Sequence, residues 1–178
     1  MMFEIRQWNP EKYRQQTRRS TLILVLIFLL LGMLLSTLSV RLFGEQGGDN
    51  FRWNLGGVIA GLVLSLALVR FKFWRQPWMA AAVYGWQLKR SLMSITNVMH
   101  HVSAGVAAQD PTAMKLLRFY HLGLGQMHQL DANSSALSQL AAEIDQHLAA
   151  MQALGMDTEQ HQLNPAWLEA VKQANAAQ

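Results

Sequence analysis

An uncharged run of twenty residues, Thr21–Val40, is the feature that most constrains this chain. At about 1.5 Å per helical residue, a run of this length spans roughly 30 Å, the thickness of the hydrocarbon core of a bilayer. A second apolar run, Leu55–Val69, follows a short polar break and is framed by Trp53 and Trp74. Because a lipid-embedded backbone has to satisfy its own hydrogen bonds, the two runs predict a transmembrane helical hairpin.

Basic residues gather on one side of this hairpin. They precede the first run and follow the second: Arg6, Lys12, Arg14, Arg18, Arg19, Arg70, Lys72 and Arg75. The loop from Arg41 to Asn54 balances two bases with two acids. The positive-inside rule therefore predicts that both termini are cytoplasmic and that the loop is external. The same rule explains the net charge of +4, so nucleic acid is not an expected partner.

The first apolar run is predicted to be a retained anchor. It is longer than the 7–15 apolar residues of a signal peptide, and Ser39–Leu42 lacks a small-residue cleavage motif. The chain contains no cysteine, which excludes disulfides, thiolate nucleophiles and cysteine-ligated metals.

The pattern predicts an all-α membrane protein, a two-helix transmembrane hairpin followed by a cytoplasmic antiparallel helical bundle. The predicted regions are a basic amphipathic segment (1–19), the hairpin (20–76, with spans at about 20–42 and 53–74 and an external loop at 43–52) and the bundle (77–178). Asn9 and Pro10 are expected to begin a helix that continues into the first span. Trp8 and Tyr13 are expected at the level of the lipid headgroups.

Small residues recur at helical spacing in both spans. They are Gly32 and Ser36 in the first, and Gly57, Gly61 and Ser65 in the second. Such residues let helix backbones approach closely in lipid. Two interpretations remain open: packing of the two spans within one hairpin, or a dimer contact across the second span. Neither span carries a charge at its centre, which argues against ion or proton transport.

Beyond the hairpin, apolar residues recur at intervals of three and four in a heptad-like seam from Trp78 to Val106. This seam predicts one long helix with coiled-coil character. Asp110 and Pro111 are expected to open a second helix.

A third helix is predicted to begin after a cap at Asn133 or Ser134 and to end with Gly155 at its C′ position. Asn164 and Pro165 are expected to begin a short last helix. All four prolines then stand at helix starts.

Six histidines are the only candidates for ligand chemistry. If the chain folds back at Gln109, His121 lies within about a turn of His101, and this pair is a candidate site for a metal or haem. Metal sites require three or four converging ligands, however, and Glu143, four residues before His147, is the only suitably spaced carboxylate. The sequence therefore predicts no cofactor and no metal. No serine or paired-carboxylate motif indicates a catalytic site, so no enzymatic activity is expected.

Four segments carry a resemblance to a known family: Asn9–Leu22, Asp49–Leu62, Arg75–Leu92 and Asp110–Leu124. They resemble small bacterial inner-membrane proteins grouped as domain of unknown function 3087. The resemblance extends over nearly the whole chain. It implies a location in the bacterial inner membrane and supplies no activity, cofactor or catalytic residue.

Taken together, these features predict a membrane-anchored interaction, scaffold or accessory protein. Its expected partners are the lipid bilayer and, through the cytoplasmic helices, a second copy or another protein. The alternatives are a helical bundle that binds a ligand, metal or haem, and an accessory subunit of a larger envelope or transport complex.

Overall fold

The computed structural model describes residues 2–176, without the side chains of residues 134–137, 139, 175 and 176. This part of the chain forms seven α-helices, two short 3₁₀ turns and two strands of two residues each. The helical fold class is therefore confirmed. The chain divides into two compact units. We call Gln15–Val83 the hairpin unit, and the chain up to Arg14 together with the chain from Tyr84 onward the helical unit.

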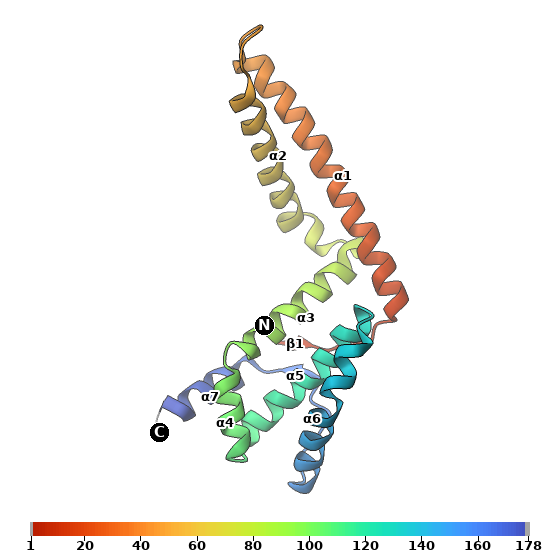
Figure 1. Ribbon diagram of the computed structural model, residues 1–178, viewed down its shortest axis with the longest axis vertical. Coiled ribbons are helices and arrows are strands. Elements are labelled where there is room, and N and C mark those ends of the chain that lie inside the picture. The colour runs from red at the N-terminus through yellow and green to blue at the C-terminus, as the bar shows by residue number, and fades with distance from the viewer. Residues whose placement is uncertain (1, 177–178) are drawn as a thin grey trace. The chain divides into compact units, whose positions relative to one another are not determined.

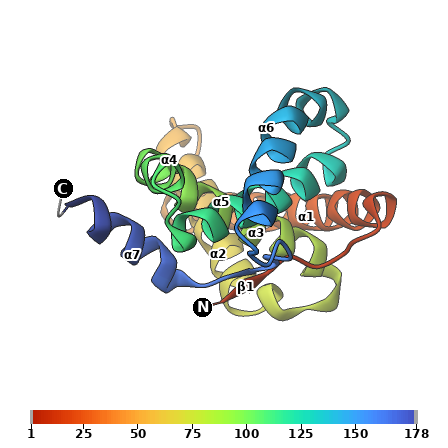
Figure 2. The same ribbon diagram turned by 90° about the horizontal axis from the view of Figure 1, so that it is seen from below.

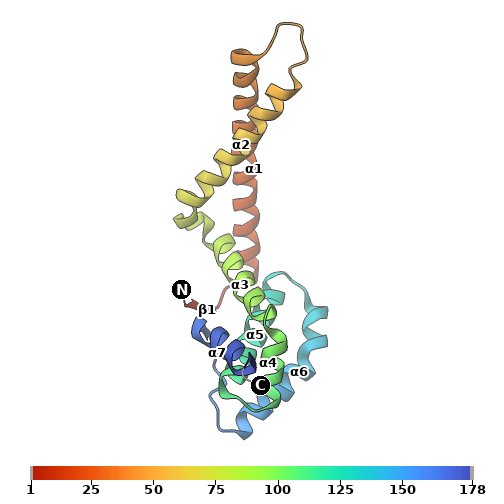
Figure 3. The ribbon, with the colours of Figure 1, turned by 90° about the vertical axis from the view of Figure 1, so that its left-hand side faces the viewer.

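Two long helices dominate the hairpin unit. Helix α1 (Pro10–Phe43) continues without interruption into the first apolar run, and α2 (Phe51–Phe71) returns along it after a short loop (Figure 1). The two helices cross one another, as Figure 3 shows. Two 3₁₀ turns, η1 (Phe73–Arg75) and η2 (Pro77–Met79), follow α2.

Five helices and a small sheet build the helical unit. Its elements are α3 (Ala80–Thr96, in this unit from Tyr84), α4 (Met99–Ala107), α5 (Pro111–Leu130), α6 (Ser134–Ala153), α7 (Pro165–Ala176), β1 (Phe3–Glu4) and β2 (Gln162–Leu163). Helix α5 packs against α4, α6 and α7, and Figure 2 shows α6 and α7 on opposite sides of it. Phe119 and Leu116 of α5 are fully buried at the centre of the core.

The predicted helix starts are confirmed at all four prolines, each of which is the first residue of α1, η2, α5 or α7. Side chains cap three of these helices, because Asn9, Asp110 and Asn164 accept hydrogen bonds from backbone N–H groups at 2.8–3.0 Å. Asn133 directly precedes α6, while the side chain of Ser134 lies outside the described residues.

Gly155 ends α6 as predicted, with a φ of +64°. The Met156 N–H donates to the Met151 carbonyl and the Gly155 N–H donates to the Gln152 carbonyl, both at 3.0 Å, which is the Schellman arrangement. Helices α4 and α5 end in the same way with non-glycine residues in the left-handed region, Gln109 and Ala132, each with a φ of 57°. Because neither helix has a glycine at this position, no glycine in the sequence marks where these two helices end.

The prediction of one unbroken helix from Trp78 to Val106 is wrong. Helix α3 ends at Thr96 and α4 begins at Met99, because Val98 leaves the helical conformation with φ −119° and ψ 17°. Val98 is nonetheless buried, so the apolar spacing of three and four continues through the break. An uninterrupted seam therefore did not require an uninterrupted helix.

The N-terminal segment belongs to the helical unit. Strands β1 and β2 pair in antiparallel fashion with Phe3 opposite Leu163, a contact that no sequence periodicity predicts. The headgroup level expected for Tyr13 stays a prediction, and the structure adds that its ring is buried in the helical unit, with its hydroxyl against Gly85. Trp8 packs beside it on Tyr84, with the two ring centroids 5.6 Å apart.

Candidate functional site

His121 stands out among the ionisable residues of the helical unit. It lies on α5, is 2% exposed, and presents its ring to His147 of α6 with 5.3 Å between the centroids. Neither ring nitrogen has a hydrogen-bond partner among the described residues. The pKa of His121 is lowered to about 4, mainly by burial and secondly by the charge of a protonated His147. The imidazole is therefore neutral at pH 7.

His147 is oriented by the backbone of α5. Its Nε2 lies 3.0 Å from the Met114 carbonyl, and since a carbonyl only accepts, Nε2 carries the hydrogen. Burial also lowers the pKa of His147. Arg118 is buried beside the pair and donates from Nε to the Thr158 carbonyl at 2.9 Å. The buried histidine cluster, defined as His121, His147 and Arg118, thus disfavours the uptake of a proton.

Glu143 is the carboxylate nearest to this cluster. Its Oε1 lies 3.6 Å from Nε2 of His121, and its side chain is 63% exposed. An exposed carboxylate is screened by water, so it offsets only part of the cost of a buried imidazolium. The spacing of Glu143 and His147 is visible in the sequence, but their position opposite His121 depends on how α6 packs on α5.

His101 of α4 contacts His100, with 3.8 Å between the ring centroids. The ring contacts of His121 come from its own neighbour Tyr120 and from His147. The His101–His121 pair stays a prediction, and the structure gives His121 a different histidine neighbour. Within residues 2–176, no three potential ligands among the histidines and carboxylates converge as a metal site.

Small residues form the contact between α1 and α2. A Cβ atom at Gly57 would meet the backbone of Leu35 and Ser36, and one at Gly61 would lie 2.8 Å from the backbone N and Cα of Gly32. Ser65 is buried and bonds the Gly61 carbonyl at 2.8 Å. We call these facing positions the glycine seam. It allows backbone-to-backbone contact that no larger residue permits.

Large apolar side chains are exposed along most of the length of both helices. Large aliphatic and aromatic side chains point outward from Leu22 to Phe43 on α1 and from Phe51 to Phe71 on α2. Helix Pro10–Phe43 and the segment Phe51–Arg75 are long and apolar enough to cross a membrane. Only 6% and 17% of their most apolar 18-residue windows are buried, so neither is a core helix of the described structure.

Aromatic and basic side chains mark the ends of these helices. At the loop end, Phe43 stacks on Trp53 with centroids 5.1 Å apart, and the Arg52 guanidinium lies 5.2 Å from the centre of the Trp53 ring. At the other end, Phe73 packs on Trp78 at 5.4 Å. The backbone there is tied to α1 by the Ser20 hydroxyl, which donates to the Trp78 carbonyl at 2.6 Å.

The fold and these surfaces define a mainly helical chain that joins two paired helices of membrane-spanning length to a helical unit with its own core. The chain matches the model of a family described as a protein of unknown function, DUF3087, over residues 3–168, and it belongs to that family. The predicted resemblance is thereby confirmed. Neither the curated proteins nor the solved structures provide a match.

Proposed function

We propose that α1 and α2 anchor this chain in the bacterial inner membrane and that the helical unit serves in the cytoplasm as a non-catalytic interaction module. The proposal that both helices lie in the membrane is supported by their outward-facing apolar side chains. Exposed apolar area on this scale is unfavourable in water and favourable in lipid. The glycine seam satisfies the remaining requirement, since it pairs the two helices without help from the hydrophobic effect.

The proposed orientation rests on flanking charge. Arg18 and Arg19 precede the first apolar run, and Lys72 and Arg75 follow the second, all of them exposed. Excess Lys and Arg close to the membrane favours the cytoplasmic side. The external loop includes Glu45 and Asp49, which do not oppose translocation.

Reporter fusions test this orientation. Alkaline phosphatase inserted after Gly47 should be active, because the enzyme folds only outside the cytoplasm, and a fluorescent protein fused after the C-terminus should fluoresce. Extraction of membranes at alkaline pH should leave the chain in the pellet. An inactive phosphatase at Gly47, or release of the chain into the alkaline supernatant, would refute the anchoring or its direction.

The interaction role is supported by apolar side chains that the helical unit leaves in solvent. Trp86 and Met93 are 48% and 65% exposed on α3, and their spacing of seven residues places them on one face. Large exposed apolar residues on one helix face are typical of a surface that another helix covers. The occupant is a second copy of this chain or another protein.

Photo-crosslinking in living cells tests the interaction role. A benzoylphenylalanine at position 93 should give a discrete adduct of higher mass, whereas the same residue at Gln152, an exposed polar position on α6, should give little. Mass spectrometry of the adduct separates self-association from a second protein. The interaction role is wrong if position 93 yields no adduct and the purified chain stays strictly monomeric.

A further inference from the structure

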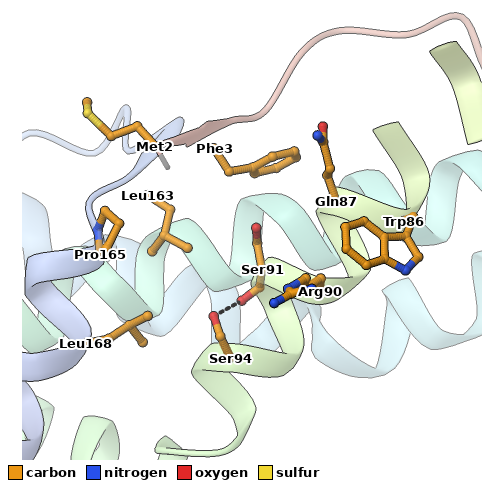
Figure 4. Close-up of a pocket in the computed structure, with 10 residues that line it drawn as sticks. All are labelled: Met2, Phe3, Trp86, Gln87, Arg90, Ser91, Ser94, Leu163, Pro165 and Leu168. Carbon is orange, nitrogen blue, oxygen red and sulfur yellow. Dashed lines mark hydrogen bonds between the residues drawn. The ribbon is translucent and has the colours of Figure 1, made fainter. Parts of the chain in front are cut away.

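The helical unit contains a pocket that neither the anchoring nor the histidine cluster uses. It has a volume of about 410 Å³ and lies between β1, α3, β2 and the start of α7 (Figure 4). This volume is within the range of roughly 300–1,000 Å³ that small-molecule sites occupy. Its two ends differ in chemistry, and that difference indicates what the pocket binds.

One end of the pocket is apolar. Leu163, Pro165 and Leu168 gather on one side of the pocket, and Phe3 lies next to Leu163 with its ring extending toward Gln87, while the Met2 side chain points away from them, as Figure 4 shows. Proline has no backbone N–H, and the N–H of Ala166 is already bonded to the Asn164 side chain at 3.0 Å. The start of α7 therefore offers this end of the pocket no free donor for an anion, and the wall accepts a hydrocarbon chain.

The other end carries polar groups from one helix. Gln87, Arg90 and Ser91 line it from α3, together with the indole of Trp86. The Arg90 guanidinium lies 5.1 Å from the centre of the Trp86 ring, which holds it beside the pocket. Among the described residues, no carboxylate pairs with Arg90, and the Gln87 amide and the Ser91 hydroxyl have no hydrogen-bond partner.

We propose that this pocket binds a single-chain fatty-acid carboxylate, with the hydrocarbon chain among Phe3, Leu163 and Leu168 and the carboxylate at Arg90 and Ser91. One guanidinium matches one negative charge, and an arginine binds a carboxylate with two parallel hydrogen bonds. A nucleotide or another polyphosphate requires several cations or a free helix N-terminus, and the pocket offers neither. Each additional methylene buried in the apolar end increases affinity about three- to fourfold.

Photolabelling of the full chain in lipid nanodiscs tests this proposal. The probe is an octanoate that carries a diazirine on its chain, and the labelled residues are mapped by mass spectrometry. We expect labels within 86–94 and 162–168, which are displaced by plain octanoate and not by octanol at the same concentration. Labels confined to α1 and α2 would show partition into the bilayer only and would overturn the proposal, as would equal displacement by octanol.

Two variants separate recognition of the charge from recognition of the chain. Arg90→Gln should reduce labelling of the pocket at least fivefold, while Lys89→Gln, its neighbour outside the pocket, should label like the parent. Leu168→Trp should abolish labelling by filling the apolar end. Circular dichroism of each variant verifies that the helices are intact. Parent-like labelling of a folded Arg90→Gln chain would overturn the assignment of the carboxylate to Arg90.

Discussion

Lowering the pH from 7 to 4 should destabilise the helical unit by about 3 kcal/mol through His121. Burial lowers the pKa of this residue from 6.5 to about 4, and each pKa unit corresponds to about 1.4 kcal/mol. Between pH 6.5 and 4, His121 is protonated in the unfolded chain but not in the folded chain. The free energy of unfolding therefore decreases as the pH is lowered, and it stops decreasing below about pH 4. His147, whose pKa burial also lowers, acts in the same direction.

The measurement is thermal unfolding of the detergent-solubilised chain, followed by circular dichroism at several pH values. For a unit of this size, 3 kcal/mol corresponds to a fall in melting temperature on the order of 15 °C. His121→Leu removes the buried, unbonded imidazole and should reduce this dependence on pH. It should also raise stability at pH 7, because two unsatisfied polar atoms leave the core.

A surface histidine provides the control for this experiment. His161 is 43% exposed and bonds Glu159 at 2.7 Å, so His161→Gln should leave most of the acid sensitivity in place. If His121→Leu and the parent lose the same stability between pH 6.5 and 4, the acid sensitivity arises elsewhere. The buried histidine cluster would then be an inert part of the core.

The sequence located the helix starts well because local chemistry determines them. A proline that follows Asn or Asp begins a helix through a fixed φ and a side-chain cap, and neither depends on distant residues. Asn9, Asp110 and Asn164 each accept the hydrogen bond that this local rule requires. The fold class and the two helices of membrane-spanning length could likewise be predicted, because composition and periodicity are also local properties of the sequence.

Contacts between distant segments could not be predicted. The pairing of Phe3 with Leu163 joins two strands of two residues each, which are too short to show an alternating pattern. The neighbours of His121 depend on the loop after α5, where Ala132 adopts the left-handed conformation that sequence reasoning reserves for glycine. Since that turn directs α6 across α5, the sequence could not place His147 beside His121.

Placing a leucine in the glycine seam should separate α1 from α2. At Gly57 a Cβ atom would overlap the backbone of Leu35 and Ser36, and a backbone cannot move aside as a flexible side chain does. Gly57→Leu should therefore destabilise the hairpin by about 3 kcal/mol, the upper end of the range for overpacking. Membrane insertion should be unchanged, because flanking charge sets topology independently of helix packing.

Gly56→Leu is the matched control for this prediction. It makes the same substitution one residue earlier, at a position where a Cβ would have no neighbour within 4 Å. Melting of the purified chains should show a lower transition temperature for Gly57→Leu alone. Equal melting of the two variants would mean that the seam does not hold the hairpin together.

Because the chain contains no cysteine, introduced cysteines can show whether the glycine seam pairs two helices of one chain or helices of two copies. Ser36 and Asn54 are hydrogen-bonded across the hairpin at 2.8 Å, so the double change Ser36→Cys and Asn54→Cys should form a disulfide within one chain on mild oxidation. Because a leucine at position 57 wedges the helices apart, it should reduce the yield severalfold, and a leucine at 56 should not. A disulfide-linked dimer in native membranes, in place of the intrachain product, would show that the glycine seam joins two copies of the chain. That is the dimer contact across the second span that the spacing of Gly57 and Gly61 also allows.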